Sequence, residues 1–192
     1  MKKRKRLFRF TVLTFVLLLG GLFFIDKITQ SKEDYSSKYI YVYDREDQSA
    51  VIEKNEKRKA FPASLTKIMT TLVALEHIDN LSEIAPVDVD TYQTMVANNA
   101  SMAGFYGLES TTYRDLLYGT MLASGGEAAN SLAINVVGTV DDFVLLMNQK
   151  ADDLGLKDTH FTNVEGFHDD DQYTTAYDMA LLLDYALQNN HF

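Results

Sequence analysis

The stretch Phe61-Pro62-Ala63-Ser64-Leu65-Thr66-Lys67-Ile68-Met69-Thr70 decides how the rest of the chain is interpreted. Pro62 suits the position just ahead of a helix, because its fixed φ and its missing N–H cost nothing there. Apolar residues follow with helical spacing, so we expect a helix to begin at or near Ser64. Lys67 lies one turn further along the same face, where an amine can accept the proton of a serine hydroxyl. The stretch therefore predicts a serine nucleophile with a lysine base, although a serine in this place is also a common helix N-cap.

Charge divides the chain into a basic tip and an acidic body. The net charge is −9, yet residues 1–9 carry six Lys and Arg and no acidic residue. The other residues hold 12 basic and all 27 acidic side chains, a balance of −15. An acidic body argues against a nucleic-acid partner. The chain has no cysteine, which excludes a disulfide framework and a lipidated cysteine.

An apolar run at residues 10–25 follows the basic tip directly. At about 1.5 Å per residue it falls somewhat short of a hydrocarbon core of about 30 Å, and residues 7–8 can extend it. No A-x-A-like cleavage site follows, which favours an uncleaved signal anchor at residues 1–25 over a cleaved signal peptide. We expect a cytoplasmic tip, a linker at residues 26–37 and an exported domain at residues 38–192 on the extracytoplasmic side of the cell membrane. Cleavage would instead give a secreted protein.

The exported part reads as a hairpin followed by helices. Residues 38–44 and 50–55 are rich in β-branched and aromatic residues on either side of a polar turn, which predicts two antiparallel strands. Helices are expected at 112–123, 127–137 and 139–155 and from 175 onward. Three of these begin with a threonine followed three residues later by an aspartate, an N-terminal capping pattern.

The stretch around Ser64 resembles the active-site segment of the serine D-alanyl-D-alanine carboxypeptidases, the low-molecular-mass penicillin-binding proteins. In that family S-x-x-K is the first of three motifs. Further similar segments follow in the family order over residues 38–190; they are residues 112–129, 147–151, 154–161, 163–167 and 174–180. The resemblance implies an α+β fold of the β-lactamase/DD-peptidase kind, an antiparallel sheet flanked by helices with a helical subdomain.

The resemblance also implies the chemistry. Ser64 would attack the terminal D-Ala-D-Ala bond as nucleophile, Lys67 would act as its base, and Ser124 of the second motif would relay a proton. The substrate would be the peptidoglycan pentapeptide stem, β-lactam antibiotics would bind at the same serine, and no cofactor or metal is implied. Substrate-binding residues are not assigned. The four histidines lack the spacing of a zinc peptidase.

The sequence departs from the family pattern at two places. Gly126 stands where the second motif has an asparagine, and Asn130, one turn on, is a candidate substitute. No K-T-G or K-S-G occurs in residues 1–192, so we expect an incomplete catalytic domain that lacks the C-terminal strands. The alternative to a carboxypeptidase is a non-catalytic remnant or a β-lactam- or peptidoglycan-binding protein of the same family. Glu165 is followed at four residues by Asp169 and not by an asparagine, so the deacylating pair of a class A β-lactamase is not expected.

Overall fold

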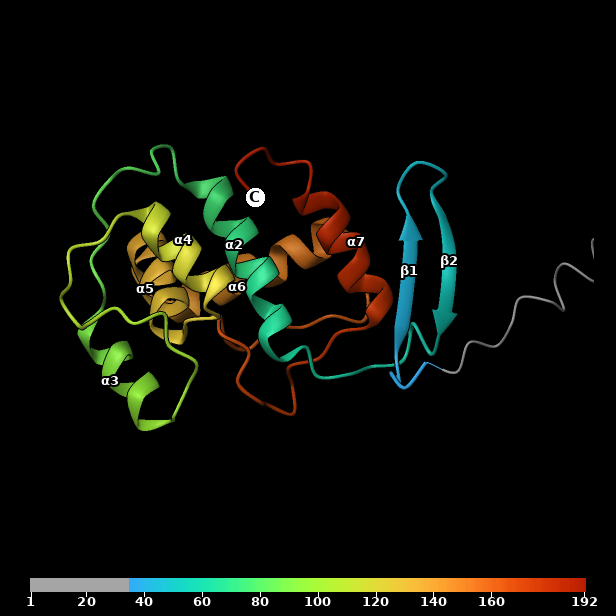
Figure 1. The fold of residues 1–192 in the computed structure, drawn as a ribbon, viewed down its shortest axis with the longest axis horizontal. Coiled ribbons are helices and arrows are strands. Elements are labelled where there is room, and N and C mark those ends of the chain that lie inside the picture. Colours follow the sequence, from blue (N-terminus) through green and yellow to red (C-terminus); the bar gives the residue numbers. More distant parts are fainter. Residues whose placement is uncertain (1–34) are drawn as a thin grey trace, which may run out of the picture. The chain divides into compact units, whose positions relative to one another are not determined.

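The computed structural model of this chain describes residues 35–192, of which Lys38–Phe192 form a compact unit. The predicted anchor at residues 1–25 and most of the predicted linker at residues 26–37 lie outside the described residues. The described part contains a strand pair and helices, so the α+β class is confirmed (Figure 1). The elements in chain order are β1 (Ile40–Asp44), β2 (Ser49–Lys54), η1 (Ala63–Leu65), α2 (Thr66–His77), α3 (Val89–Ala97), α4 (Tyr113–Leu122), α5 (Gly126–Val137), α6 (Val140–Asp153) and α7 (Ala176–Ala186).

Helix α2 is the centre of the helical part. It contacts α4, α5, α6 and α7, and Figure 1 shows it between α4 and α7. Met69, Leu72 and Val73 are at most 1% exposed, as the apolar spacing of the sequence requires. Leu65, at the start of the run, is instead 51% exposed. Because α2 is packed by helices on several sides, its orientation is fixed, and so is the position of Lys67 in its first turn.

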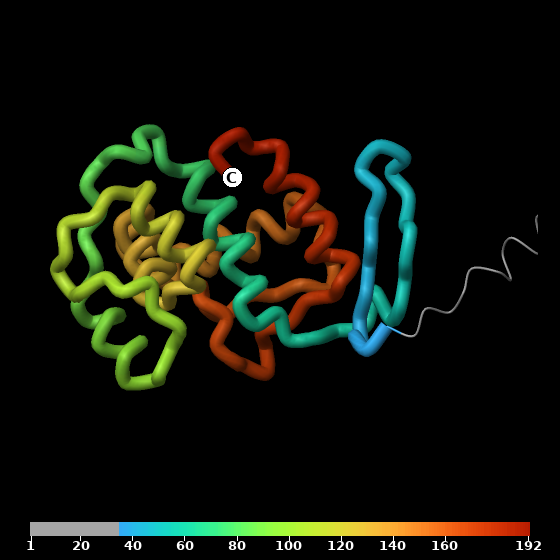
Figure 2. The backbone as a smooth tube through the Cα atoms, in the orientation of Figure 1, coloured from blue at the N-terminus to red at the C-terminus, as the bar shows by residue number. Residues whose placement is uncertain are grey.

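The strand pair is a hairpin that packs against α7. β1 and β2 are antiparallel, with Ile40 opposite Lys54 and a register shift between Val42 and Tyr43. Figure 2 shows β1 between α7 and β2, and the rings of Tyr41 and Tyr177 pack in a T-shaped arrangement with their centroids 5.0 Å apart. The predicted strands at 38–44 and 50–55 are thus confirmed to within two residues. Within the described residues this sheet has two strands.

The predicted helix starts are confirmed by their caps. Thr112 and Asp115 form a capping box at α4, in which each side chain accepts from the other residue's main-chain N–H. The side chains of Thr139 and Thr175 accept from the main-chain N–H of Asp142 and Asp178 at α6 and α7. A threonine that accepts at N3 satisfies one of the free N–H groups of the first turn.

Two elements differ from expectation. Helix α5 begins at Gly126 with Gly125 as its N-cap, so the glycine pair does not simply separate two helices but opens the second one. Helix α3 was not predicted. Its N-cap is Asp88, whose carboxylate accepts from the N–H of Thr91 at 2.8 Å. With a single buried residue, Met95, its periodic signal is weak.

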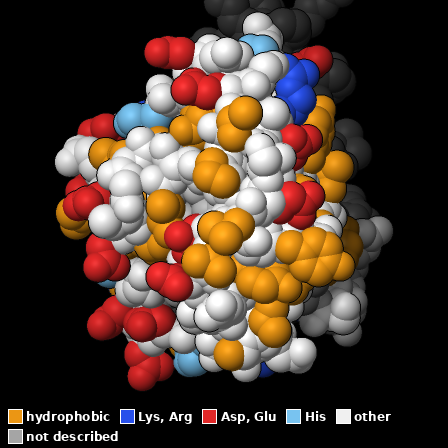
Figure 3. All heavy atoms as spheres, turned by 90° about the vertical axis from the view of Figure 1, so that its left-hand side faces the viewer, with side chains coloured by type: hydrophobic (Ala, Val, Ile, Leu, Met, Phe, Trp, Pro, Cys, Tyr) orange, Lys and Arg blue, Asp and Glu red, His pale blue; other side chains and the backbone are white. Residues whose placement is uncertain are grey.

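The face formed by α3, α4 and the loop between them carries apolar side chains among polar ones (Figure 3). The exposed apolar residues of these segments include Val96, Tyr106, Leu108, Tyr118 and Leu122.

Across residues 35–192 no single helix has the length and hydropathy to cross a membrane. The helices α5 and α6 reach that length and hydropathy only when taken together, and the chain bends by 87° between them.

Candidate active site

Ser64 lies in a tight turn that leads into α2. It is the middle residue of the 3-10 turn Ala63–Leu65, and α2 begins at Thr66, so the predicted place near a helix N-terminus is confirmed. Ala63 has a φ of 49°, a conformation uncommon for a residue with a Cβ. Gly166 packs directly on this turn, and a Cβ at residue 166 would overlap the carbonyl of Ala63. The packing of Gly166 thereby holds the main chain around Ser64 in this conformation.

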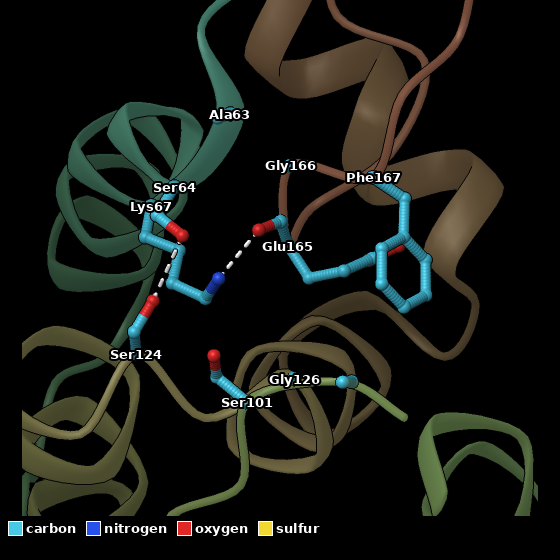
Figure 4. Close-up of a pocket in the computed structure, with 10 residues that line it drawn as sticks. Ala63, Ser64, Lys67, Ser101, Ser124, Gly126, Glu165, Gly166 and Phe167 are labelled. Atoms are coloured by element: carbon cyan, nitrogen blue, oxygen red, sulfur yellow. Dashed lines mark hydrogen bonds between the residues drawn. The ribbon is translucent and has the colours of Figure 1, made fainter. Parts of the chain in front are cut away.

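Ser124 reaches Ser64 from the second motif. It follows the last turn of α4, with a φ of 56°, and precedes the N-cap of α5. Its hydroxyl donates to the Ser64 hydroxyl at 3.0 Å (Figure 4). Two residues with positive φ, Ala63 and Ser124, thus flank one pocket, and strained main chain of this kind clusters at functional sites.

Lys67 is buried beside the two serines. Its side chain points into the same pocket, and the residue is 4% exposed (Figure 4). Burial lowers the pKa of Lys67, while the carboxylates of Glu165 and Glu127 oppose that change. Among the described residues, the hydrogen-bond acceptor of its Nζ is the main-chain oxygen of Glu165, not the Ser64 hydroxyl. The structure therefore brings the three predicted residues together, and the lysine is held by Glu165, for which the sequence predicted no such role.

The pocket is small and open to solvent on one side. Its volume is about 90 Å³, and Figure 4 shows Ser101 reaching in from the wall that faces Lys67. The lining residues are Ala63, Ser64, Lys67, Ala100, Ser101, Ser124, Gly126, Glu165, Gly166 and Phe167. Three hydroxyls, an amine and the main-chain carbonyl of Glu165 thus meet at one cavity. Within residues 35–192 no group of three or more His, Cys, Asp or Glu side chains has the arrangement of a metal site.

Asn130 does not replace the missing asparagine directly. Its Nδ2 donates to the carbonyl of Gly126 at 2.9 Å and to a carboxylate oxygen of Glu165 at 3.1 Å. The space beside Gly126 is filled by Met95, which is 4% exposed. Asn130 therefore reaches Lys67 only through Glu165, and the expected substitution is indirect.

Glu127, in the first turn of α5, supports one wall of the pocket. It is fully buried, and one carboxylate oxygen accepts from the N–H groups of Ala103 at 2.7 Å and Gly104 at 3.0 Å. In this first turn an acidic side chain stabilises the helix N-terminus. This carboxylate fixes the loop that carries Ser101, a role that the sequence pattern alone did not reveal.

Known proteins resemble this chain over most of its length. Residues 26–192 match peptidase family S11, described as D-alanyl-D-alanine carboxypeptidase. The chain belongs to this family. It is 32% identical over 148 residues to the D-alanyl-D-alanine carboxypeptidase DacF of Bacillus subtilis, covering 77% of this chain and 38% of that protein. It is 36% identical over 135 residues to DacD of Escherichia coli, covering 67% and 34%.

Solved structures of D-alanyl-D-alanine carboxypeptidases and DD-transpeptidases superpose on this chain. The DD-transpeptidase of Streptomyces K15 superposes with a TM-score of 0.77 at 30% identity, covering 82% of this chain and 64% of that one. The carboxypeptidase DacD of Francisella tularensis gives a TM-score of 0.75 at 32% identity, covering 81% and 38%. The predicted family and fold are thus confirmed. The chain spans between about a third and two thirds of the length of these relatives.

Proposed function

We propose that this chain is the nucleophile-bearing part of a serine D-alanyl-D-alanine carboxypeptidase that acts on peptidoglycan stem peptides. The observation that carries the proposal is the 3.0 Å contact between the Ser64 and Ser124 hydroxyls in a pocket that also holds buried Lys67. Family membership supports the substrate class, since the relatives are named D-alanyl-D-alanine carboxypeptidases.

In the proposed reaction the Ser64 oxygen attacks the carbonyl carbon between the two D-Ala residues. Neutral Lys67 takes the hydroxyl proton, the C–N bond breaks, and a proton passes through Ser124 to the leaving amine. Free D-Ala departs and water later cleaves the Ser64 ester. β-Lactams would acylate the same oxygen. No metal or cofactor takes part in this scheme.

The base must be neutral, so the rate of acylation should rise with pH as Lys67 loses its proton. Burial lowers the pKa of Lys67 from its ordinary value, which brings this rise toward lower pH than an exposed lysine would give. The rise is therefore the signature of the lysine base.

The test is labelling of the full chain in detergent with a fluorescent penicillin. Labelling should be lost in Ser64→Ala and strongly reduced in Lys67→Ala, because the first removes the nucleophile and the second its base. Ser49→Ala, in the hairpin and outside the pocket, serves as the control and should label normally. Labelling that persists in Ser64→Ala would place the reactive group elsewhere.

A second candidate function is a non-catalytic protein that binds β-lactams or peptidoglycan. Gly126 in place of the motif asparagine favours this candidate. Release of D-Ala from a D-Ala-D-Ala peptide distinguishes the two. The enzyme releases D-Ala and loses this activity in Ser64→Ala, whereas the binder takes up the penicillin label but releases no D-Ala.

For location we propose a membrane anchor at residues 1–25 with the catalytic part on the extracytoplasmic side. The basic tip and the apolar run of residues 10–25 support this orientation. The peptidoglycan substrate lies outside the cell membrane, which agrees with it.

A further inference from the structure

The ammonium group of Lys67 depends on the segment around residue 165. Lys67 Nζ donates to the main-chain oxygen of Glu165, 98 residues away in the sequence. This segment is tied to α2 a second time, because the Thr70 hydroxyl donates to the carbonyl of Val164 at 2.7 Å. The two contacts lie one turn apart on α2, so a shift of the segment would displace the lysine.

The side chain of Glu165 ties the same segment to α5. Its carboxylate accepts from Asn130 Nδ2 at 3.1 Å, and that amide also donates to the carbonyl of Gly126 at 2.9 Å. Figure 4 shows the Glu165 carbonyl directed at Lys67 while its side chain runs away, behind the ring of Phe167. One residue thus connects the lysine with the helix that opens at the second motif.

Two carboxyl groups act on Lys67, and they differ in their surroundings. Glu127 on α5 accepts two main-chain N–H groups and holds a loop, so its removal would dismantle structure. Glu165 is 9% exposed, and its carboxylate accepts a hydrogen bond from the side chain of Asn130. Burial raises the pKa of Glu165, and the Asn130 hydrogen bond and Lys67 oppose this. Its charge can therefore be removed by an amide of the same shape.

We propose that Glu165 is a positioning residue for Lys67, whose main-chain oxygen accepts from the amine and whose carboxylate, held by Asn130, keeps the segment that carries this oxygen in place. The proposal rests on the proposed function in so far as Lys67 is the base. An anionic Glu165 stabilises the protonated lysine by charge. Removing that charge should make the lysine neutral at lower pH, and breaking the bond to Asn130 should loosen its orientation.

The first experiment measures the rate of Ser64 acylation by a fluorescent penicillin against pH, on the full chain in detergent. Glu165→Gln keeps an oxygen for Asn130 but has no charge, so the rising part of the profile should move to lower pH with little loss of the plateau rate. Asp170→Asn is the matched control, because it makes the same charge change in a nearby loop at a side chain that is 97% exposed. Its profile should coincide with that of the unmodified chain.

Glu165→Met separates the two effects. It removes the charge and also the acceptor for Asn130, so the profile should move in the same direction while the plateau rate falls. Methionine also suits a buried position, so this variant remains informative if the amide of Glu165→Gln prevents folding. A profile that does not move to lower pH in whichever variant folds, or an undiminished plateau rate in Glu165→Met, would overturn the proposal.

The second experiment follows the titration of Lys67 by NMR of ¹³C-labelled lysine, with the resonance assigned by its loss in Lys67→Arg. The midpoint should fall in Glu165→Gln and stay unchanged in Asp170→Asn. This readout needs no catalysis. A chain that fails to react with penicillin but shows the shifted midpoint would refute the proposed function alone, and an unshifted midpoint would refute the role of Glu165.

Discussion

At the scale of single residues, Gly126 and Met95 have to be considered together. Gly126 occupies the place of a motif asparagine, and a Cβ at residue 126 would lie 2.7 Å from Met95 Sδ and 3.3 Å from Ala100 Cβ. Met95 is the one buried residue of α3, so the side chain that fills this space also anchors that helix. Restoring the asparagine therefore requires room as well as the right functional group.

We predict that Gly126→Asn alone destabilises the chain by about 1–3 kcal/mol, the usual cost of overpacking a filled site. Adding Met95→Ala should recover part of that loss, because the two changes share one space and so are not additive. Thermal unfolding of the two single variants and the double variant checks this. If the loss of stability in the double variant equals the sum of the losses in the two single variants, the prediction is wrong.

At the scale of elements, α4 is the support of the second motif. Its capping box of Thr112 and Asp115 fixes where the helix begins, and Ser124 follows two residues after its last helical residue, Leu122. The hydrogen bonds from Thr112 lower the pKa of Asp115, so the box is strongest when this carboxylate is ionised. A helix that starts in a fixed register delivers its C-terminal end, and the serine beyond it, to a fixed place.

We predict that Thr112→Ala lowers the free energy of unfolding by about 1 kcal/mol, because a main-chain N–H loses its acceptor. Thr112→Ser, which keeps the hydroxyl, is the control and should lose much less. Because the folded-state pKa of Asp115 is lowered, its stabilising contribution is present above the unfolded-state pKa and is lost as the pH falls through the folded-state value. The difference between Thr112→Ala and the unmodified chain should therefore shrink in acid, as denaturant unfolding at two pH values would show.

At the scale of the whole molecule, residues 38–192 and the N-terminal segment are considered separately. Lys38–Phe192 is a compact unit with its own core, built around α2. The hairpin joins this core through α7, while Val42 and Val51 on its strands remain 42% and 52% exposed. The membrane anchor proposed for residues 1–25 rests on sequence alone.

We predict that the full chain, expressed in a bacterial cell, sediments with membranes and stays there after a high-salt wash, because an apolar anchor is not released by screening charge. A chain that begins at residue 38 provides the comparison for the contribution of the segment. Sequencing of the mature N-terminus gives the decisive reading. A start within residues 26–37 would show a cleaved signal peptide and contradict the anchor.

The sequence by itself determined the features that depend on neighbouring residues. The turn at Ser64, the helix with Lys67 one turn later, the three threonine caps and the hairpin all follow from signals within a few residues of each other. The family resemblance added the pairing of Ser64 with Ser124, which are 60 residues apart. Helix α3 was missed because its local signal is a single cap and one buried residue.

Only the tertiary structure decided how Lys67 is held. Its partner Glu165 lies 98 residues away, and the amide that holds Glu165 comes from Asn130 on a third element. No local pattern marks such residues, because a hydrogen bond between distant segments depends on how the helices pack. Burial is likewise a property of the assembled core, and it is burial that lowers the pKa of Lys67 and raises that of Glu165. The sequence thus determined which groups could react, and packing determined how they are oriented and in which direction their pKa values shift.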